Sequence, residues 1–232
     1  MGPKPNTRTR SGRGKSRRGG GVSIGAGMAG VLVEDLLQAN DYDRYLNEFH
    51  NSRLTSSQFF CDIDTIERLG YGFKYLLAFQ NLRTFLGLRN LYDPSQVKAF
   101  YCIFERQPDN VSFTCPFNKC VVTLTPSKWA GLVGLGCDGV DIESADVFPG
   151  YNKESLVQSI SKTCVAPVEH SNFSAMQLKC DDKILHWIIA KIIICKQDNF
   201  GRIDNFDLQV MWLIKNRIKV NWPLFLCNRM IT

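Results

Sequence analysis

Two pairs of aspartates are the residues whose type and spacing come closest to catalytic chemistry. Asp62 and Asp64 lie in "FFCDIDTIE", and Asp181 and Asp182 stand at the start of "CDDKILHWIIAKIIICK". Paired carboxylates hold the metal ions of two-metal nucleases and transposases, but such enzymes need one aspartate on a central strand and partners that converge from other elements. The sequence indicates no sheet of several strands, and acids at helix starts usually act as caps. We therefore interpret both pairs as capping groups, and a degraded nuclease stays as a third alternative.

The nine cysteines form no zinc-binding pattern. Structural zinc sites use tight ligand pairs about two to four residues apart, followed by a second tight pair. Cys115 and Cys120 are more widely spaced, and they flank a predicted turn, so we expect two reduced, metal-free thiols close together on facing strands. An odd number of cysteines in apolar contexts such as "IIIC" and "LFLC" indicates buried thiols of an intracellular protein. Other metal-ligand types recur downstream at loose spacing, namely Cys164, His170, Cys180 and His186.

A glycine-rich stretch near the start places Gly25, Gly27 and Gly30 in the order G-x-G-x-x-G. This pattern binds a dinucleotide where a strand delivers the first glycine and a second strand follows the helix. Only residues 22–24 separate Gly25 from a run of glycines and arginines, and "NDYDRYLNEFHNS" is not a strand pattern, so we interpret the glycines as a hinge. Motifs of serine hydrolases, zinc hydrolases and phosphate-binding loops are missing too. We expect a protein that is not an enzyme and uses no cofactor.

The strongest chemical signal is a basic tail, residues 1–27, which is rich in Gly, Ser, Arg and Pro and has no aromatic residue. Such a composition cannot bury enough apolar surface to offset chain entropy, so we expect disorder. Seven cations precede the first acid, Glu34, which leaves 21 Lys and Arg residues with all 22 Asp and Glu residues of the chain. We predict that the tail contacts the phosphates of nucleic acid non-specifically and supports nuclear import. Its predicted nucleic-acid-binding residues are Lys4, Arg8, Arg10, Arg13, Lys15, Arg17 and Arg18.

A second basic stretch, "KNRIK" at Lys215–Lys219, is a weaker candidate and is interpreted as a solvated helix end. No apolar region follows the basic start as in a secretory signal, and position 6 is Asn6 where a myristoylation site needs Ser or Thr. The longest apolar run, "ILHWIIAKIII", is about half a membrane span and contains His186 and Lys191. We expect no membrane association.

Capping residues mark two helices in the body, residues 28–232. Asp93 precedes Pro94 in "YDPSQVKAFYCIFER", and Thr125 precedes Pro126 in "TPSKWAGLVGLG". Each pair predicts a helix that begins at the proline. The alternating pattern of "VSFTCPFNKCVVTLT" between them predicts a β-hairpin. The residues predicted to face the core from these two helices are Val97, Phe100, Tyr101, Phe104, Trp129, Leu132 and Val133.

The C-terminal part of the body predicts three further helices. "CDDKILHWIIAKIIICK" is apolar nearly all round, so we expect a central helix with Trp187, Ile188 and Ile192 buried against the helix that follows. Asp204 and Asp207 predict a capped start for that next helix, and residues 221–223 begin a short third one. The fold class is thus mainly α, a single helical domain with a small antiparallel hairpin.

Four phrases of the body occur in a familiar order: "VKAFYCIFERQ", "VSFTCPFNKCVVTLTPSKWAGLVGLGCDGVDI", "LKCDDKILHWIIAKIII" and "NFDLQVMWLIKNRIKVNWPLFLCNRM". Their spaced apolar residues, over about residues 45–230, resemble the plant transposon protein domain family, whose members are linked to transposons and retroelements. The resemblance implies a plant protein with no catalytic residues to carry over. The chain has "CKQDNFGR" where many members have a Pro-Arg step, and it stops at "NRMIT" where further helices are expected, which suggests a truncated or decayed copy.

Together, these features predict a non-enzymatic, transposon-derived plant protein that contacts nucleic acid through its tail. The alternative is a capsid-like assembly module of a retroelement, which requires self-association.

Overall fold

The computed structural model describes residues 33–52, 59–89, 93–117, 120–144, 148–162, 173–196 and 199–231. By its internal contacts the chain divides into two units, Met1–Val31 and Leu32–Thr232, and every described residue belongs to the second. The predicted disorder of residues 1–27, the predicted hinge glycines and the seven predicted nucleic-acid-binding cations lie outside the described residues.

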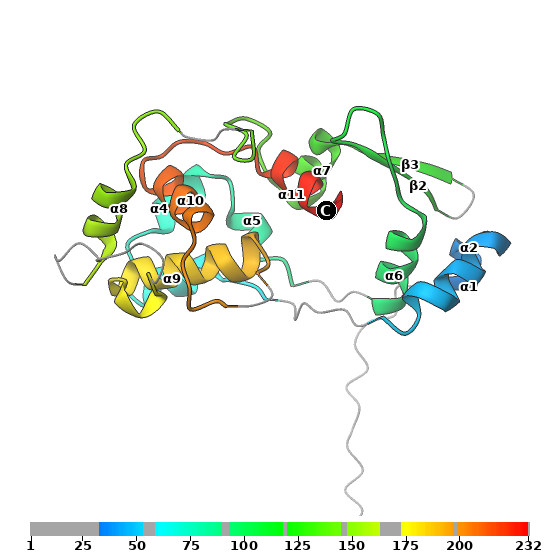
Figure 1. Ribbon diagram of the computed structural model, residues 1–232, viewed down its shortest axis with the longest axis horizontal. Helices are drawn as coiled ribbons and strands as arrows, with labels where there is room; N and C mark the ends of the chain where they lie inside the picture. Colours follow the sequence, from blue (N-terminus) through cyan, green and yellow to red (C-terminus); the bar gives the residue numbers. More distant parts are fainter. Residues whose placement is uncertain are drawn as a thin grey trace, which may run out of the picture. The chain divides into compact units, whose positions relative to one another are not determined.

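The second unit is mainly helical, as the sequence predicts, and carries a small antiparallel sheet (Figure 1). The sheet has one strand more than the predicted hairpin, because the chain pairs residues 105–106 with β2 directly after it leaves a helix. Its strands are β1 (Glu105–Arg106), β2 (Phe113–Phe117) and β3 (Cys120–Leu124), in that order. The α-helices are α1 (Val33–Leu36), α2 (Ala39–Arg44), α3 (Ile63–Arg68), α4 (Lys74–Phe79), α5 (Arg83–Leu86), α6 (Pro94–Ile103), α7 (Pro126–Val133), α8 (Lys153–Ile160), α9 (Cys180–Ile188), α10 (Asn205–Lys215) and α11 (Trp222–Ile231). The π-helical turns are η1 (Tyr45–Phe49) and η4 (Ile189–Ile193), and η3 (Ala175–Gln177) is a 3-10 turn.

The predicted helix starts are confirmed, because side chains at the caps accept hydrogen bonds from the first free amides. Asp93 accepts hydrogen bonds from the amides of Ser95 and Gln96, and α6 begins at Pro94, directly after Asp93. Thr125 caps α7 in the same way, and Gly134 ends that helix in the left-handed conformation, with φ of 70°. At α10, Asp204 and Asp207 form a reciprocal capping box.

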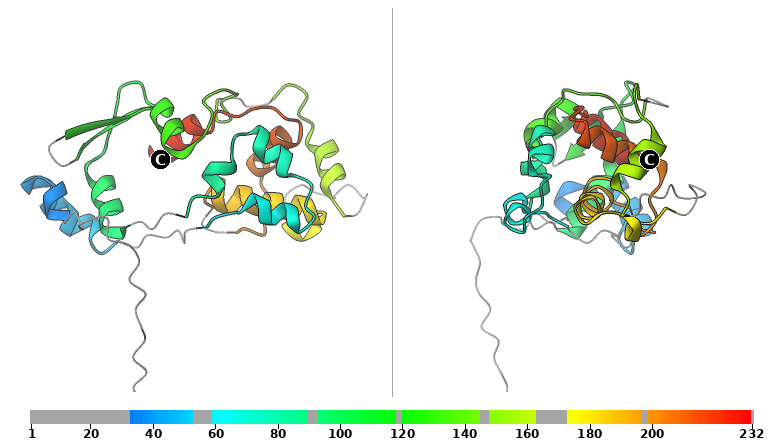
Figure 2. Two further views of the ribbon diagram at one scale, coloured as in Figure 1. Left: turned by 180° about the vertical axis from the view of Figure 1, so that it is seen from behind. Right: turned by 90° about the vertical axis from the view of Figure 1, so that its left-hand side faces the viewer.

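The larger of two core clusters surrounds α9, η4 and α10. Ile188 and Leu213 are fully buried in it, and Ile192 is 8% exposed. α10 contacts both α9 and η4 on one side and α4 and α8 on others (Figures 1 and 2). The prediction that α9 is central is therefore confirmed for Ile188 and Ile192. It is wrong for Trp187, which is 40% exposed, because α10 covers only one side of the helix.

A smaller core cluster joins α1, η1, α6 and β2. Here α6 buries Ala99, Cys102 and Ile103, which lie against the short helices that precede it. The predicted apolar face of α6 is wrong at Tyr101, which is 36% exposed. On α7 the prediction is likewise wrong at Leu132, which is 67% exposed, since the contact of α7 with α11 buries Ala130 instead.

The hairpin register separates the two thiols that we expected to meet across the strands. Cys115 lies opposite Val122, and Cys120 lies opposite Phe117. Both are free cysteines, but Cys115 is buried against α6 while Cys120 is exposed. The two thiols are thus two residue pairs apart along the ladder, with the Pro116–Val121 pair between them, and they lie in different environments.

Within the described ranges, no helix combines the length and the apolar character needed to cross a bilayer.

Candidate functional site

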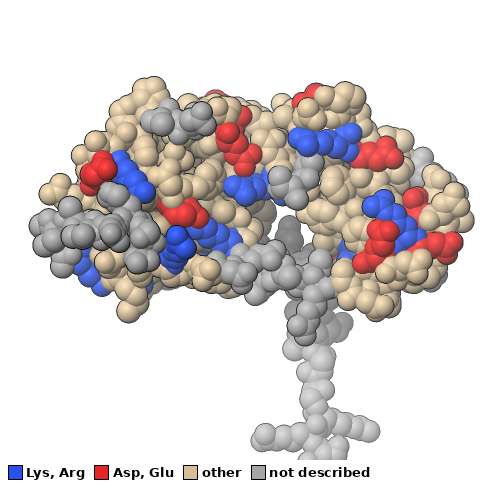
Figure 3. Space-filling view, in the orientation of Figure 1, with Lys and Arg blue, Asp and Glu red and all other residues tan. Residues whose placement is uncertain are grey.

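Several lysines and arginines in the described part of the chain form ion pairs with carboxylates. Lys74, Arg83 and Arg89 reach aspartates or glutamates of α3 and its cap. Lys196, Lys215, Lys219 and Arg229 each meet a carboxylate from another element. Figure 3 shows the result, with blue and red side chains side by side on the visible face. Most of these cations are therefore held by the protein itself.

In the first aspartate pair, Asp62 is a helix cap as the sequence predicts, whereas Asp64 is not. Asp62 caps α3, because its carboxylate accepts from the Asp64 amide at 3.1 Å and from the Thr65 hydroxyl at 2.9 Å. The hydrogen bond from Thr65 is the main reason that the pKa of Asp62 lies below its usual range, and Arg89 adds to it. Asp64 binds the Arg83 guanidinium through both of its oxygens, at 2.8 and 2.7 Å. These contacts give both carboxylates structural partners.

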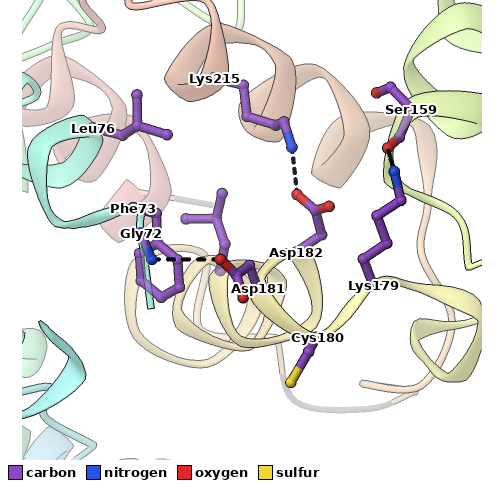
Figure 4. A pocket seen from close by; sticks show the side chains of 10 residues that line it. Gly72, Phe73, Leu76, Ser159, Lys179, Cys180, Asp181, Asp182 and Lys215 are labelled. Carbon is purple, nitrogen blue, oxygen red and sulfur yellow. Dashed lines mark hydrogen bonds and ion pairs between the residues drawn. The ribbon is translucent and has the colours of Figure 1, made fainter. Parts of the chain in front are cut away.

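The second aspartate pair lines a pocket of about 500 Å³ at the start of α9 (Figure 4). The capping role predicted for this pair is wrong, because no side chain caps the start of α9. Asp182 is buried and pairs with Lys215 from α10, while Asp181 accepts from the Gly72 amide at 3.4 Å. Lys179 donates to the main-chain carbonyl of Ser159. Figure 4 shows the Cys180 thiol pointing away from the Asp182–Lys215 pair. The pocket balances two cations against two anions, so it offers no net charge to a ligand.

Cys180 has a partner outside the pocket, the phenol of Tyr71. A hydrogen bond with this thiol raises the pKa of Tyr71, and the charge of Asp181 acts in the same direction. Tyr71 therefore stays a neutral phenol.

The prediction that the basic stretch Lys215–Lys219 is a solvated helix end is confirmed only in part, because α10 ends at Lys215 and Asn216 and Arg217 are exposed, but the two outer lysines form ion pairs. Lys215 pairs with Asp182 and Lys219 with Asp138. The backbone beyond Lys219 forms a parallel bridge between Val220 and Val140. Gly139 is needed there, because its φ is 130° and a Cβ would lie 2.5 Å from the carbonyl carbon of Lys219. The segment is thus part of the framework.

A buried ionic cluster connects α9 and the segment after η4 to the start of α10. The carboxylate of Asp207 is fully buried, and its Oδ2 accepts from His186 Nε2 at 3.4 Å, from the Asp204 amide at 3.1 Å and from the Lys196 ammonium group. Because a carboxylate only accepts, Nε2 of His186 carries the proton. No described group pairs with the other oxygen of Asp207, Oδ1. The sequence predicts the cap at Asp207 but not the lysine and histidine.

The charges of this cluster stabilise one another against the apolar surroundings. Burial opposes the ionisation of Asp207, but hydrogen bonds from His186 and Lys196 outweigh it and hold the pKa of Asp207 below its usual value of 3.8. Burial likewise opposes the charge of Lys196, and hydrogen bonds to Asp204 and Asp207 raise its pKa above 10.5. The cluster is therefore charged at neutral pH.

The thiols and the remaining metal-ligand types do not assemble into a site among the described residues. Burial raises the pKa of Cys115 and of Cys227 to about 11, which keeps both thiols protonated. Within the described ranges no group of three or more His, Cys, Asp or Glu side chains could hold a metal ion. Cys164 and His170 lie outside those ranges.

Sequence reasoning missed a surface on which aromatic rings and cations alternate. Trp187, Phe59 and Phe60 are 40%, 38% and 45% exposed, and the rings of Trp187 and Phe59 meet edge to face with centroids 6.0 Å apart. Lys191 Nζ lies 5.2 Å from the Phe59 centroid, and Arg89 lies over Phe60 at 4.3 Å. The four-residue spacing of Lys183, Trp187 and Lys191 could have revealed it, since residues four apart share one side of a helix.

The chain was compared with protein-family models, with curated proteins and with solved structures, and none of them matched.

Proposed function

We propose that this chain is a non-enzymatic nucleic-acid-binding protein of plant transposon origin, and that its basic tail contacts phosphate groups and directs the protein to the nucleus. The observation that carries the proposal is the charge asymmetry. Seven cations precede the first acid, and the rest of the chain has nearly equal numbers of Lys and Arg and of Asp and Glu. The transposon origin rests on the family resemblance of the apolar phrases.

The ion pairs of the body support the assignment to the tail. Lys215 and Lys219 were the other basic candidates, and each is held by an aspartate. A phosphate would have to compete with these carboxylates. Tail cations with no acid before Glu34 can instead release counterions along a nucleic-acid backbone.

The test is binding of the intact chain and of a chain lacking residues 1–27 to a DNA duplex across a range of salt. Seven phosphate contacts give a slope of about −6 for log affinity against log salt. The deletion is expected to abolish most binding and to leave the body folded. Neutralising Arg13, Lys15, Arg17 and Arg18 should weaken binding for all sequences alike, whereas Lys215→Ala is the matched control outside the tail. Full affinity in the deleted chain would refute the proposal.

The alternative, a capsid-like assembly module, is favoured by one feature of the sheet. β3 is an edge strand, and its Val121 and Val122 are 70% and 41% exposed. Such an edge can pair with another chain. Sedimentation of the tail-deleted chain at increasing concentration tests this alternative, which requires oligomers that Val121→Lys abolishes.

A further inference from the structure

We propose that the aromatic–lysine surface, formed by Phe59, Phe60, Arg89, Lys183, Trp187 and Lys191, binds single-stranded nucleic acid by stacking its bases. The inference rests on the proposed function, because the tail supplies the general attraction for phosphate. It adds a second contact, in the folded body, that selects the single-stranded form.

The helix geometry brings the central residues of this surface together. Lys183, Trp187 and Lys191 follow one another at four-residue intervals along α9 and η4, so the ring lies between two cations on one side of the helix. The opposite side, with Leu185 and Ile192, is buried in the larger core cluster. The surface is therefore built on a rigid, well-packed element.

The exposed rings are available to a flat partner. Trp187 and Phe59 meet edge to face, at an interplanar angle of 83°, so each ring keeps much of its faces uncovered by the other. Both remain more than one-third exposed. Unpaired bases stack on such rings irrespective of sequence, whereas a duplex hides the faces of its bases.

The cations make the surface suited to an anionic partner rather than to an apolar one. Among the described residues, no carboxylate forms an ion pair with Lys183 or Lys191, in contrast to Lys196, Lys215 and Lys219. Lys191 instead lies over the rings of Phe59 and Phe200. Arg89 lies 3.9 Å from Asp62 and also covers Phe60. Rings for bases beside ammonium groups for phosphates are the usual make-up of single-strand-binding surfaces.

The test compares Trp187→Ala with the intact chain, using fluorescence anisotropy of a labelled oligothymidylate and of a hairpin duplex. Trp187→Ala should weaken binding of the single strand about tenfold and leave duplex binding unchanged. Trp187→Phe should recover most of the affinity. Tyr75→Ala removes an aromatic ring of α4 that is more exposed than Trp187, at 71% against 40%, and should change neither. Lys191→Ala should reduce the salt slope for the single strand by about one, while Trp187→Ala should leave that slope unaltered.

The outcomes separate this inference from the proposed function. If the intact chain binds neither oligonucleotide, the proposed function fails and this inference fails with it. If the intact chain binds both and Trp187→Ala affects neither or both equally, the tail remains the binding site and the inference alone is overturned. Loss of concentration-dependent self-association in Trp187→Ala, with single-strand affinity intact, would assign the surface to contacts between copies of the chain and would also overturn it.

Discussion

The two sides of the helix formed by α9 and η4 differ in burial and in the kinds of residue that they carry. The side toward α10 is apolar and buried, with Leu185, Ile188 and Ile192, and it carries the buried histidine of the ionic cluster. The outward side presents Trp187 between Lys183 and Lys191. The first side stabilises the fold through packing and paired charge. The second contributes little burial, which leaves its residues free to bind a partner.

This difference shows why an apolar helix need not be buried all round. Trp187 lies in the sequence between His186 and Ile188, which are both buried, although its indole is more apolar than the imidazole of His186. Only the position of α10 decides which side is covered. Four predictions, from the largest expected effect to the smallest, test whether the two sides are as different as the structure indicates.

Removing the carboxylate of the ionic cluster should have the largest effect. Asp207→Ala leaves Lys196 and His186 without their buried partner, and breaking a buried pair on one side typically destabilises a protein by about 3 to 5 kcal/mol. Urea denaturation measures the change. Asp182→Ala is the matched control, because its partner Lys215 has a side chain that is 31% exposed and can turn to water. An equal loss in both variants would mean that burial of the cluster adds nothing.

A cavity on the α10 side of the helix should have the second-largest effect on stability. Ile188 is fully buried, so Ile188→Ala should destabilise the protein by about 2 to 4 kcal/mol through the lost transfer energy and the remaining cavity. Nucleic-acid affinity at temperatures where the variant is folded should not change. Unaltered urea midpoints would contradict the assignment of this side to the core.

Low pH should destabilise the fold by protonating Asp207 on the α10 side of the helix. Because the folded pKa of Asp207 lies below its usual value of 3.8, its contribution to stability is full above 3.8 and is lost as pH falls through the lower folded value. Lys196, whose folded pKa lies above 10.5, contributes below that value and loses its effect as pH rises through the higher one. Urea midpoints should therefore fall at both extremes. In Asp207→Asn the fall of the urea midpoint at low pH should be smaller. An unchanged fall would mean that other carboxylates cause the acid sensitivity.

Changes on the outward side should have the smallest effect on stability. Lys183→Ala removes an exposed side chain and should shift the free energy of unfolding by less than about 0.5 kcal/mol. Thermal melts monitored by circular dichroism would detect a larger shift. Such a shift would show that the outward side also supports the fold, and the contrast between the two sides would disappear.

Much of the fold could be predicted because its signals are local. The starts of α6, α7 and α10 depend on a capping side chain and the next few amides, so Asp93, Thr125 and Asp204 specify them from the sequence alone. The hairpin follows from alternation around a turn. The sides of the helices could not be predicted as well. Leu132 and Trp187 are apolar residues in apolar segments, and whether they are covered depends on distant elements.

The candidate sites likewise contain features that the sequence predicts and features that it does not predict. The sequence predicts that Asp62 caps a helix, and α3 begins as expected. It does not predict that Lys196 is the buried partner of Asp207, because 11 residues and a change of element separate them. It also predicts a solvated "KNRIK" stretch, whereas Lys215 and Lys219 find carboxylates 33 and 81 residues away.

The sequence by itself determined the mainly helical class, the caps that start the helices, and the concentration of excess positive charge before Glu34. These properties depend on composition and on neighbours within a few residues, where the geometry of one helix turn is fixed. Only the tertiary structure decided which side of α9 faces water, which lysines are held by aspartates and which aromatic rings lie beside cations. Those properties depend on contacts between segments that are far apart in the chain, and no local sequence pattern specifies these contacts.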